Sequence, residues 1–194
     1  MRYAEVKRFL LAKLKKELPQ HLSYHSVEHV KDVINSCKQI AKHENVKGLE
    51  LKLLLTAALF HDSGFLVNSK NHEQLSCDIA RQYLPLYDYD NEQIERICGM
   101  IMATKVPQKP HNHLEEIICD ADLDYLGRED FFTIGDKLFD ELCVYGILNT
   151  EDEWNELQVK FLEAHNYFTK TAIQLRKDKK DKHIKMVKSK LGKK

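Results

Sequence analysis

The chain has 194 residues, which is enough for one domain with a sizeable core and too few for two independent domains of ordinary size. Thirty Lys and Arg residues balance thirty Asp and Glu residues, so the protein as a whole has no general attraction for nucleic acid or an anionic membrane. Five spread cysteines without a CxxC pair fit neither a disulfide framework nor a zinc ribbon, and no segment approaches the roughly 18 apolar residues of a membrane span. We therefore expect a cytoplasmic protein with reduced thiols.

Apolar residues recur at three and four residue spacing in almost every segment, while Gly and Pro are scarce. This pattern predicts an all-α fold, a single compact helical bundle. The first helices are expected over residues 3–18, 26–43 and 49–62. The third of these is apolar nearly all round, which is typical of a helix buried in the middle of a domain.

Capping signatures mark the later helices, because a side-chain acceptor is followed three residues on by Glu or Gln. Helices over 91–105 and 113–126 are separated by a loop with two prolines, and another helix fits 130–145. Four helices are predicted to begin after the capping residues Asn71, Asp90, Asn112 and Thr150.

The C-terminal segment 176–194 contains ten Lys or Arg residues against two Asp residues. It predicts a basic helical tail, interpreted first as a frayed, solvated helix and second as a weak phosphate-attracting arm. A nucleic-acid partner is disfavoured, because the neutral body lacks interleaved basic and aromatic residues. The oligomeric state is not readable from the sequence.

The stretch "AALFHDSGF", residues 57–65, ends an apolar helix in an adjacent histidine and aspartate, His61 and Asp62. A charge at the end of a buried segment is costly unless it is paired or bound to a metal. The dipeptide therefore needs partners elsewhere in the chain.

A helical wheel identifies one carboxylate partner in "LEEIICDADLDYLG". Asp122 falls inside the apolar arc, whereas Asp120 and Asp124 project from the opposite side. A capping or salt-bridged aspartate remains the alternative for Asp122.

Three histidines are placed by the same method. His25 and His29 lie four residues apart on one side of a helix, with His29 beside the apolar stripe and His25 one turn earlier, towards a cleft. His72 looks inward from the first turn of its own helix. Hydrogen-bonded core histidines remain the alternative.

Two imidazoles and two carboxylates make a plausible octahedral N and O ligand set, without cysteine. The four residues are His29, His61, Asp62 and Asp122.

These residues resemble the pattern of the HD-domain superfamily of metal-dependent phosphohydrolases. The similarity covers roughly residues 20–170 and includes "FHDSGF", "NHEQLS" and "CDADLDYLG". It implies an HD-domain helical fold and one divalent ion (Mn, Mg, Fe, Co, Ni or Zn) on the four ligands named above. It also implies hydrolysis of a small phosphate ester, of a nucleotide or related metabolite, by a metal-bound hydroxide, with Asp62 among the catalytic residues.

The motif "YHSVEHVKDV" is also similar to a stretch of the class I cyclic nucleotide phosphodiesterases, which implies that His25 is a general acid. The chain lacks the further metal histidine of those enzymes and the paired histidines of HD-GYP phosphodiesterases. Cyclic nucleotide cleavage is therefore an alternative, as is a regulatory module that binds metal and nucleotide without turnover. A second ion or the phosphate is expected to contact His72, Thr104, Lys105 or Arg128.

Overall fold

The structure is a computed structural model that describes residues 1–191. These residues form nine α-helices and three short 3-10 helices without a strand, which confirms the predicted all-α fold. None of the helices in this part of the chain is both long and apolar enough to cross a bilayer. The elements are α1 (Tyr3–Glu17), α2 (Val27–His43), α3 (Gly48–Phe60), η1 (Ser63–Leu66), α4 (His72–Tyr83), η2 (Leu84–Tyr87), α5 (Asn91–Ala103), α6 (His113–Asp122), η3 (Asp124–Gly127), α7 (Phe131–Val144), α8 (Glu151–Ala164) and α9 (Lys170–Leu191).

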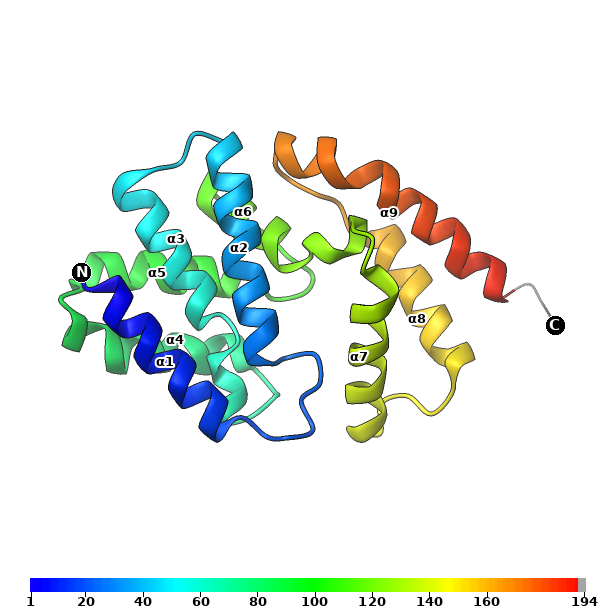
Figure 1. Ribbon diagram of the computed structural model, residues 1–194, viewed down its shortest axis with the longest axis horizontal. Helices are drawn as coiled ribbons and strands as arrows, with labels where there is room; N and C mark the ends of the chain where they lie inside the picture. The colour runs from blue at the N-terminus through cyan, green and yellow to red at the C-terminus, as the bar shows by residue number, and fades with distance from the viewer. Residues whose placement is uncertain (192–194) are drawn as a thin grey trace.

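The helices form two groups, as Figure 1 shows. Helices α1 to α6 make a bundle around α3, whose residues from Leu53 to Phe60 are all buried. Helices α7 to α9 lie on the other side and pack over a second apolar cluster, centred on Leu126, Phe131 and Leu162. The segment from α6 through η3 connects the two groups, so residues at the end of α6 lie between them.

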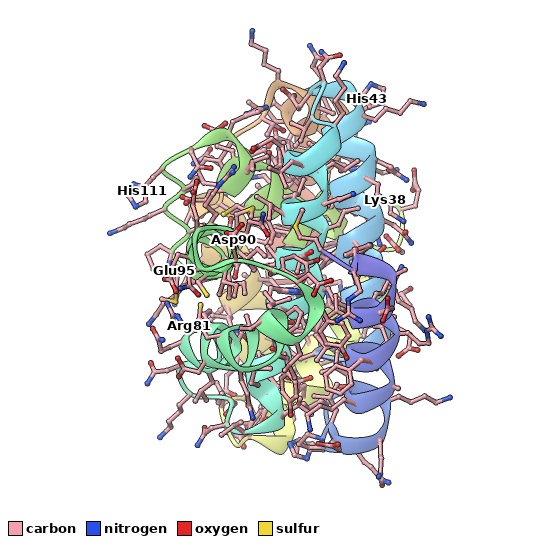
Figure 2. The ribbon with its side chains drawn as sticks, turned by 90° about the vertical axis from the view of Figure 1, so that its left-hand side faces the viewer. Lys38, His43, Arg81, Asp90, Glu95 and His111 are labelled. Atoms are coloured by element: carbon pink, nitrogen blue, oxygen red, sulfur yellow. The ribbon has the colours of Figure 1, made fainter. Side chains whose placement is uncertain are left out.

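Three of the four predicted caps form. The side chains of Asp90, Asn112 and Thr150 each accept a hydrogen bond from the backbone N–H three residues on. Asn71 makes no such bond and adopts a left-handed backbone conformation instead. Figure 2 shows Asp90 on an outer face of the bundle, near the exposed ion pair between Arg81 of α4 and Glu95 of α5. Such surface pairs contribute at most about 1 kcal/mol, so packing around α3 must stabilise the bundle.

The C-terminal basic segment differs from the expected solvated tail. Residues 176–191 continue α9, and Lys180, His183 and Val187 on this helix are buried. Arg176 donates hydrogen bonds of 2.6 and 3.1 Å to Asp124 of η3. The prediction of a solvated tail is therefore wrong for this part, because one face of the helix packs on α8 and η3; residues 192–194 lie outside the described part.

Helix α9 docks so closely on η3 that only glycine fits at position 127. A Cβ atom added at Gly127 would lie 2.4 Å from the carbonyl oxygen of Arg176. At Gly135 in α7, the nearest atoms to an added Cβ would be 3.6 Å away, which is ordinary van der Waals contact. Gly135 therefore provides a matched control.

We expect Gly127→Ala to lower the free energy of unfolding by about 1 to 3 kcal/mol, because the methyl group forces α9 from η3. Gly135→Ala should be neutral or stabilising by up to about 1 kcal/mol, since Ala is favoured over Gly inside a helix. Urea denaturation of both variants measures the difference. Equal stabilities would contradict the close docking of α9.

Candidate metal centre

The apolar helix α3 delivers His61 and Asp62 to the interior. His61 is 1% exposed and Asp62 is 6% exposed. The Nδ1 of His61 lies 2.9 Å from the carbonyl oxygen of Ala58, to which it donates as N–H, and this turns Nε2 towards the other side chains of the cluster. The sequence folds this way because seven consecutive buried residues before Phe60 fix the helix end rigidly.

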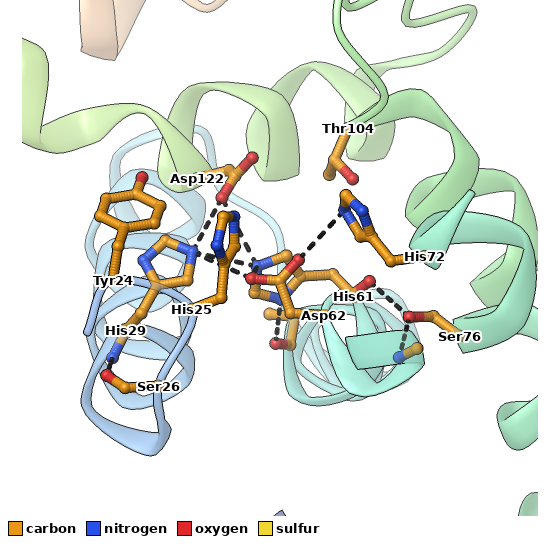
Figure 3. Close-up of polar contacts among 12 residues, drawn as sticks. Tyr24, His25, Ser26, His29, His61, Asp62, His72, Ser76, Thr104 and Asp122 are labelled. Carbon is orange, nitrogen blue, oxygen red and sulfur yellow. Dashed lines mark hydrogen bonds and ion pairs between the residues drawn. The ribbon is translucent and has the colours of Figure 1, made fainter. Parts of the chain in front are cut away.

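Two helices, α2 and α6, bring two further side chains to this dipeptide. His29 enters from the first turn of α2, whose N-cap Ser26 accepts a hydrogen bond from the His29 backbone. Asp122 enters from the last residue of α6. Figure 3 shows the side chains of His29, His61, Asp62 and Asp122 converging on one point.

The two imidazole nitrogens lie close to each other and to one oxygen of each carboxylate. The Nε2 of His29 lies 3.3 Å from Asp62 Oδ2, 3.2 Å from Asp122 Oδ1 and 3.3 Å from His61 Nε2. The Nε2 of His61 lies 3.1 Å from Asp62 Oδ2 and 3.4 Å from Asp122 Oδ1. Neighbouring ligands on an ion with bonds of about 2.0 to 2.1 Å are separated by about 3.0 Å in an octahedral site and about 3.3 Å in a tetrahedral one.

One buried oxygen supports the fit to a metal ion. Asp62 Oδ2 has no hydrogen-bond partner, although two imidazole nitrogens lie within 3.3 Å of it. A buried carboxylate oxygen without a hydrogen bond is costly, and an ion at the shared point would satisfy it. The ligand atoms of His29, His61 and Asp122 lie within 4.8 Å of one another and could hold a metal ion. Asp62 Oδ2 lies within 3.3 Å of both imidazole nitrogens.

Electrostatic attraction holds the four groups together. Burial alone lowers the pKa of His29, but the carboxylates of Asp122 and Asp62 raise it to about 9. Burial likewise opposes ionisation of Asp122, but the two imidazoles lower its pKa to about 2. The pKa of His61 is raised and that of Asp62 is lowered by the same mutual attraction, which outweighs burial in both cases. The cluster therefore holds protons on its imidazoles that a metal ion must displace.

His72 reaches the other oxygen of Asp62. A Cβ at Gly64 would lie 2.0 Å from the carbonyl oxygen of His72, so this glycine lets η1 touch the first turn of α4. The contact brings His72 Nε2 to 3.6 Å from Asp62 Oδ1 and equally close to Glu73 Oε1. His72 is thus beside the cluster without sharing its central point (Figure 3).

His25 stands at the same site in contact with a residue that the sequence analysis missed. Its Nδ1 meets Glu141 Oε1 in a short hydrogen bond, and the backbone N–H groups of Tyr24 and His25 donate to Glu141 Oε2 at 2.9 and 3.1 Å. Burial raises the pKa of Glu141, but these bonds lower it below its ordinary value overall. The His25 ring also stacks on Phe65 with centroids 4.1 Å apart. Glu141 follows Leu138 by three residues on α7, so a helical wheel of that segment could have placed it inward.

A cavity of about 220 Å³ opens beside the cluster. Asp62 and Asp122 line it together with His25, His72 and Thr104. Its opposite wall comes from η3, α7 and α8. The two carboxylates among the candidate ligands therefore face a space that a small molecule can enter.

The profile of the HD domain family matches residues 26–124, just over half of the chain, and these residues include all four converging side chains. The chain belongs to the HD domain family. Helices α7 to α9, with Glu141, lie outside the matched segment of this HD domain protein.

Two crystal structures are similar to the whole HD domain protein. One, described as a predicted HD superfamily hydrolase from an uncultured Thermotogales bacterium, is 18% identical, with a TM-score of 0.64 over 95% of this chain and 90% of that chain. The other, a protein from Lactobacillus plantarum, is also 18% identical, with a TM-score of 0.68 over 97% of this chain and 96% of that chain. At this identity the likeness shows the fold alone. No curated protein matches the chain.

The other residues that were expected to contact phosphate are not all at the site. Thr104 is buried and lines the cavity, where its hydroxyl donates to the carbonyl oxygen of Ile101. Lys105 is exposed and does not line the cavity. Arg128 lies outside it, and its guanidinium pairs with the carboxylates of Asp32, Asp124 and Asp130.

The aspartates on either side of Asp122 were expected to face away from the core, and the structure corrects this. Asp120 is fully buried and accepts the backbone N–H groups of Phe168 and Thr169 at 2.9 and 2.8 Å. Asp124 is 3% exposed and pairs with Arg176. The wheel failed because α6 ends at Asp122 and because α9 and the segment before it cover the side opposite the cluster. Both residues therefore anchor α9.

Uptake of a divalent ion should release at least one proton, because His29 holds a proton at neutral pH while a ligand imidazole must be neutral. Raising the pH from 6 to 8 should therefore increase the apparent affinity by about tenfold per unit for each displaced proton. Calorimetric titration with Mn²⁺ in buffers of different ionisation heat measures the proton count. A count of zero and a pH-independent affinity would contradict this description of the cluster.

Asp122→Asn should weaken binding of the same ion by at least about tenfold, because it removes one anionic ligand. Asp78 is exposed on α4, and Asp78→Asn is the matched control for lost charge. Elemental analysis after dialysis compares the two. Equal metal content in both variants would rule out Asp122 as a ligand.

Proposed function

We propose that this HD domain protein is a metal-dependent phosphohydrolase that cleaves a phosphate ester of a nucleotide or a related small metabolite. The observation that carries the proposal is the convergence of His29, His61, Asp62 and Asp122 beside a cavity that His25 also lines. A ligand cluster alone fits storage of an ion. A ligand cluster beside a small-molecule cavity and a proton donor held in place, here His25, fits hydrolysis.

The four converging side chains would hold one divalent ion, which fits their N and O atoms and suits Mn, Mg, Fe, Co, Ni or Zn. When bound, such an ion supplies a water of lowered pKa and polarises a phosphoryl oxygen. Asp62 turns its second oxygen towards His72, and this oxygen can accept a hydrogen bond from the attacking water. His72 is then the side chain nearest to the phosphate or to a second ion.

His25 has the position of a general acid. With its Nδ1 engaged by Glu141, its Nε2 is the ring nitrogen left to give a proton to the leaving oxygen. Stacking on Phe65 and the hydrogen bond to Glu141, which accepts two further hydrogen bonds from backbone N–H groups, hold the ring in one orientation. A pre-oriented donor of this kind is typically worth 10² to 10⁴ in rate, roughly.

The proposal is tested with a panel of nucleoside monophosphates, cyclic nucleotides and sugar phosphates, each assayed with Mn, Mg, Co and Ni. We expect metal-dependent release of product from at least one ester, lost on chelation and in Asp122→Asn. Product from cyclic nucleotides alone would favour a diesterase. Tight nucleotide binding without product from any substrate would contradict catalysis and favour a regulatory module.

His25→Asn should lower kcat for an alkyl phosphate ester by roughly 10² to 10⁴ and change little for a nitrophenyl ester, whose leaving group needs no proton. Metal content should not change. Glu141→Gln should shift kcat in the same direction with a smaller effect, since it weakens the orientation of His25 and not the donor itself. A large, equal loss on both esters would exclude the general-acid role.

A further inference from the structure

The cavity beside the metal cluster has two unlike ends. Asp62, Asp122, His25 and His72 form one end. The part of the lining that α7 and α8 supply, here called the apolar end, is mostly apolar and aromatic and includes Phe131, Leu138, Leu142, Trp154 and Phe161. A pocket with a polar end and an apolar end fixes both the position and the class of its ligand.

The charges of the lining exclude a ligand with much negative charge. Among the described residues that line the cavity, the ionisable side chains are Asp62, Glu73 and Asp122, two histidines and two tyrosines, with no Lys or Arg. Lys105 is exposed and lies outside the cavity lining, and Arg128 pairs with three carboxylates. A second phosphate or a carboxylate would therefore meet no cation at the apolar end.

The size of the cavity admits one ring system. Its volume is about 220 Å³. An engineered apolar cavity of about 150 Å³ in another protein is large enough to bind benzene. Gly135 of α7 keeps this space open, because it lies against Trp154 and Gln158, and any larger residue there projects towards their side chains.

We propose that the ligand of this site carries one phosphate and an uncharged, ring-sized apolar group, which occupies the end of the cavity formed by α7 and α8. The assignment of the phosphate end rests on the proposed function. The amide of Gln158, 7% exposed beside the ring position, provides one neutral polar contact for a ring heteroatom. Residues 131–162 thus select the substrate, and they lie outside the segment matched by the family profile.

Binding of non-hydrolysable phosphonates to the Mn²⁺-loaded protein tests this without turnover. The probes are ethylphosphonate, 3-phenylpropylphosphonate and 3-(4-carboxyphenyl)propylphosphonate. The phenyl compound should bind at least about tenfold more tightly than the ethyl compound, and the added carboxylate should cost at least about tenfold. Equal binding of the first two, or tighter binding of the carboxylate, would overturn the proposal.

Gly135→Leu should remove the preference for the phenyl compound and leave ethylphosphonate binding and metal content unchanged. Asp136→Leu adds the same side chain at an exposed position of α7 and should retain the preference. Gly135→Ala, whose methyl group fits at ordinary contact distance, provides a smaller change if the leucine variant does not fold. A preference that survives in both Gly135 variants would place the ring elsewhere.

The two proposals fail separately. Phosphonate selectivity without hydrolysis of any ester would contradict only the proposed function. Hydrolysis without phosphonate selectivity would contradict only this inference.

Discussion

The structure depends on the burial of two carboxylates and two imidazoles at one point. Each of these groups is costly to bury alone, and each is stabilised by the opposite charge of its neighbours about 3 Å away. Such a cluster needs rigid supports, since a shift of one ångström in any helix would separate a pair. The buried helix α3, the capped start of α2 and the last turn of α6 are those supports.

Much of the fold and of the cluster follows from the sequence. The 3.6-residue periodicity and the capping residues Asp90, Asn112 and Thr150 indicate where helices begin, because these signals act within a few neighbouring residues. The wheel selected His29 and Asp122, and the structure brings both to His61 and Asp62. The local sequence pattern is sufficient to predict the orientation of a side chain when its side of the helix packs against the hydrophobic core.

The sequence was less informative wherever distant segments meet. Asp120 and Asp124 were predicted to face outward, but residues 168–176 cover that side. The sequence of α6 alone does not indicate that a distant segment packs there. The basic residues of α9 were expected to be solvated for the same reason, because the segment's own sequence does not show that it packs on α8 and η3. Glu141 was missed because its partner His25 lies 116 residues away, and a buried acid is identified as functional only when its partner is known.

The two helical groups contribute different residues to the site. The part within the family profile supplies the four converging side chains, and the part beyond it supplies Glu141 and the apolar wall. If the proposed function holds, chemistry and selectivity rest on different parts of the chain. The two similar crystal structures share the fold at 18% identity, which leaves ample room for different walls around the same arrangement of helices.

We propose that His29, His61, Asp62 and Asp122 bind one divalent ion. X-ray absorption spectroscopy of the Co²⁺-loaded protein tests it most directly. We expect a first shell of only N and O atoms at about 2.0 to 2.2 Å with the outer-shell scattering of two imidazoles, reduced to one in His29→Ala. A shell without imidazole scattering, or one that contains sulfur, would contradict it.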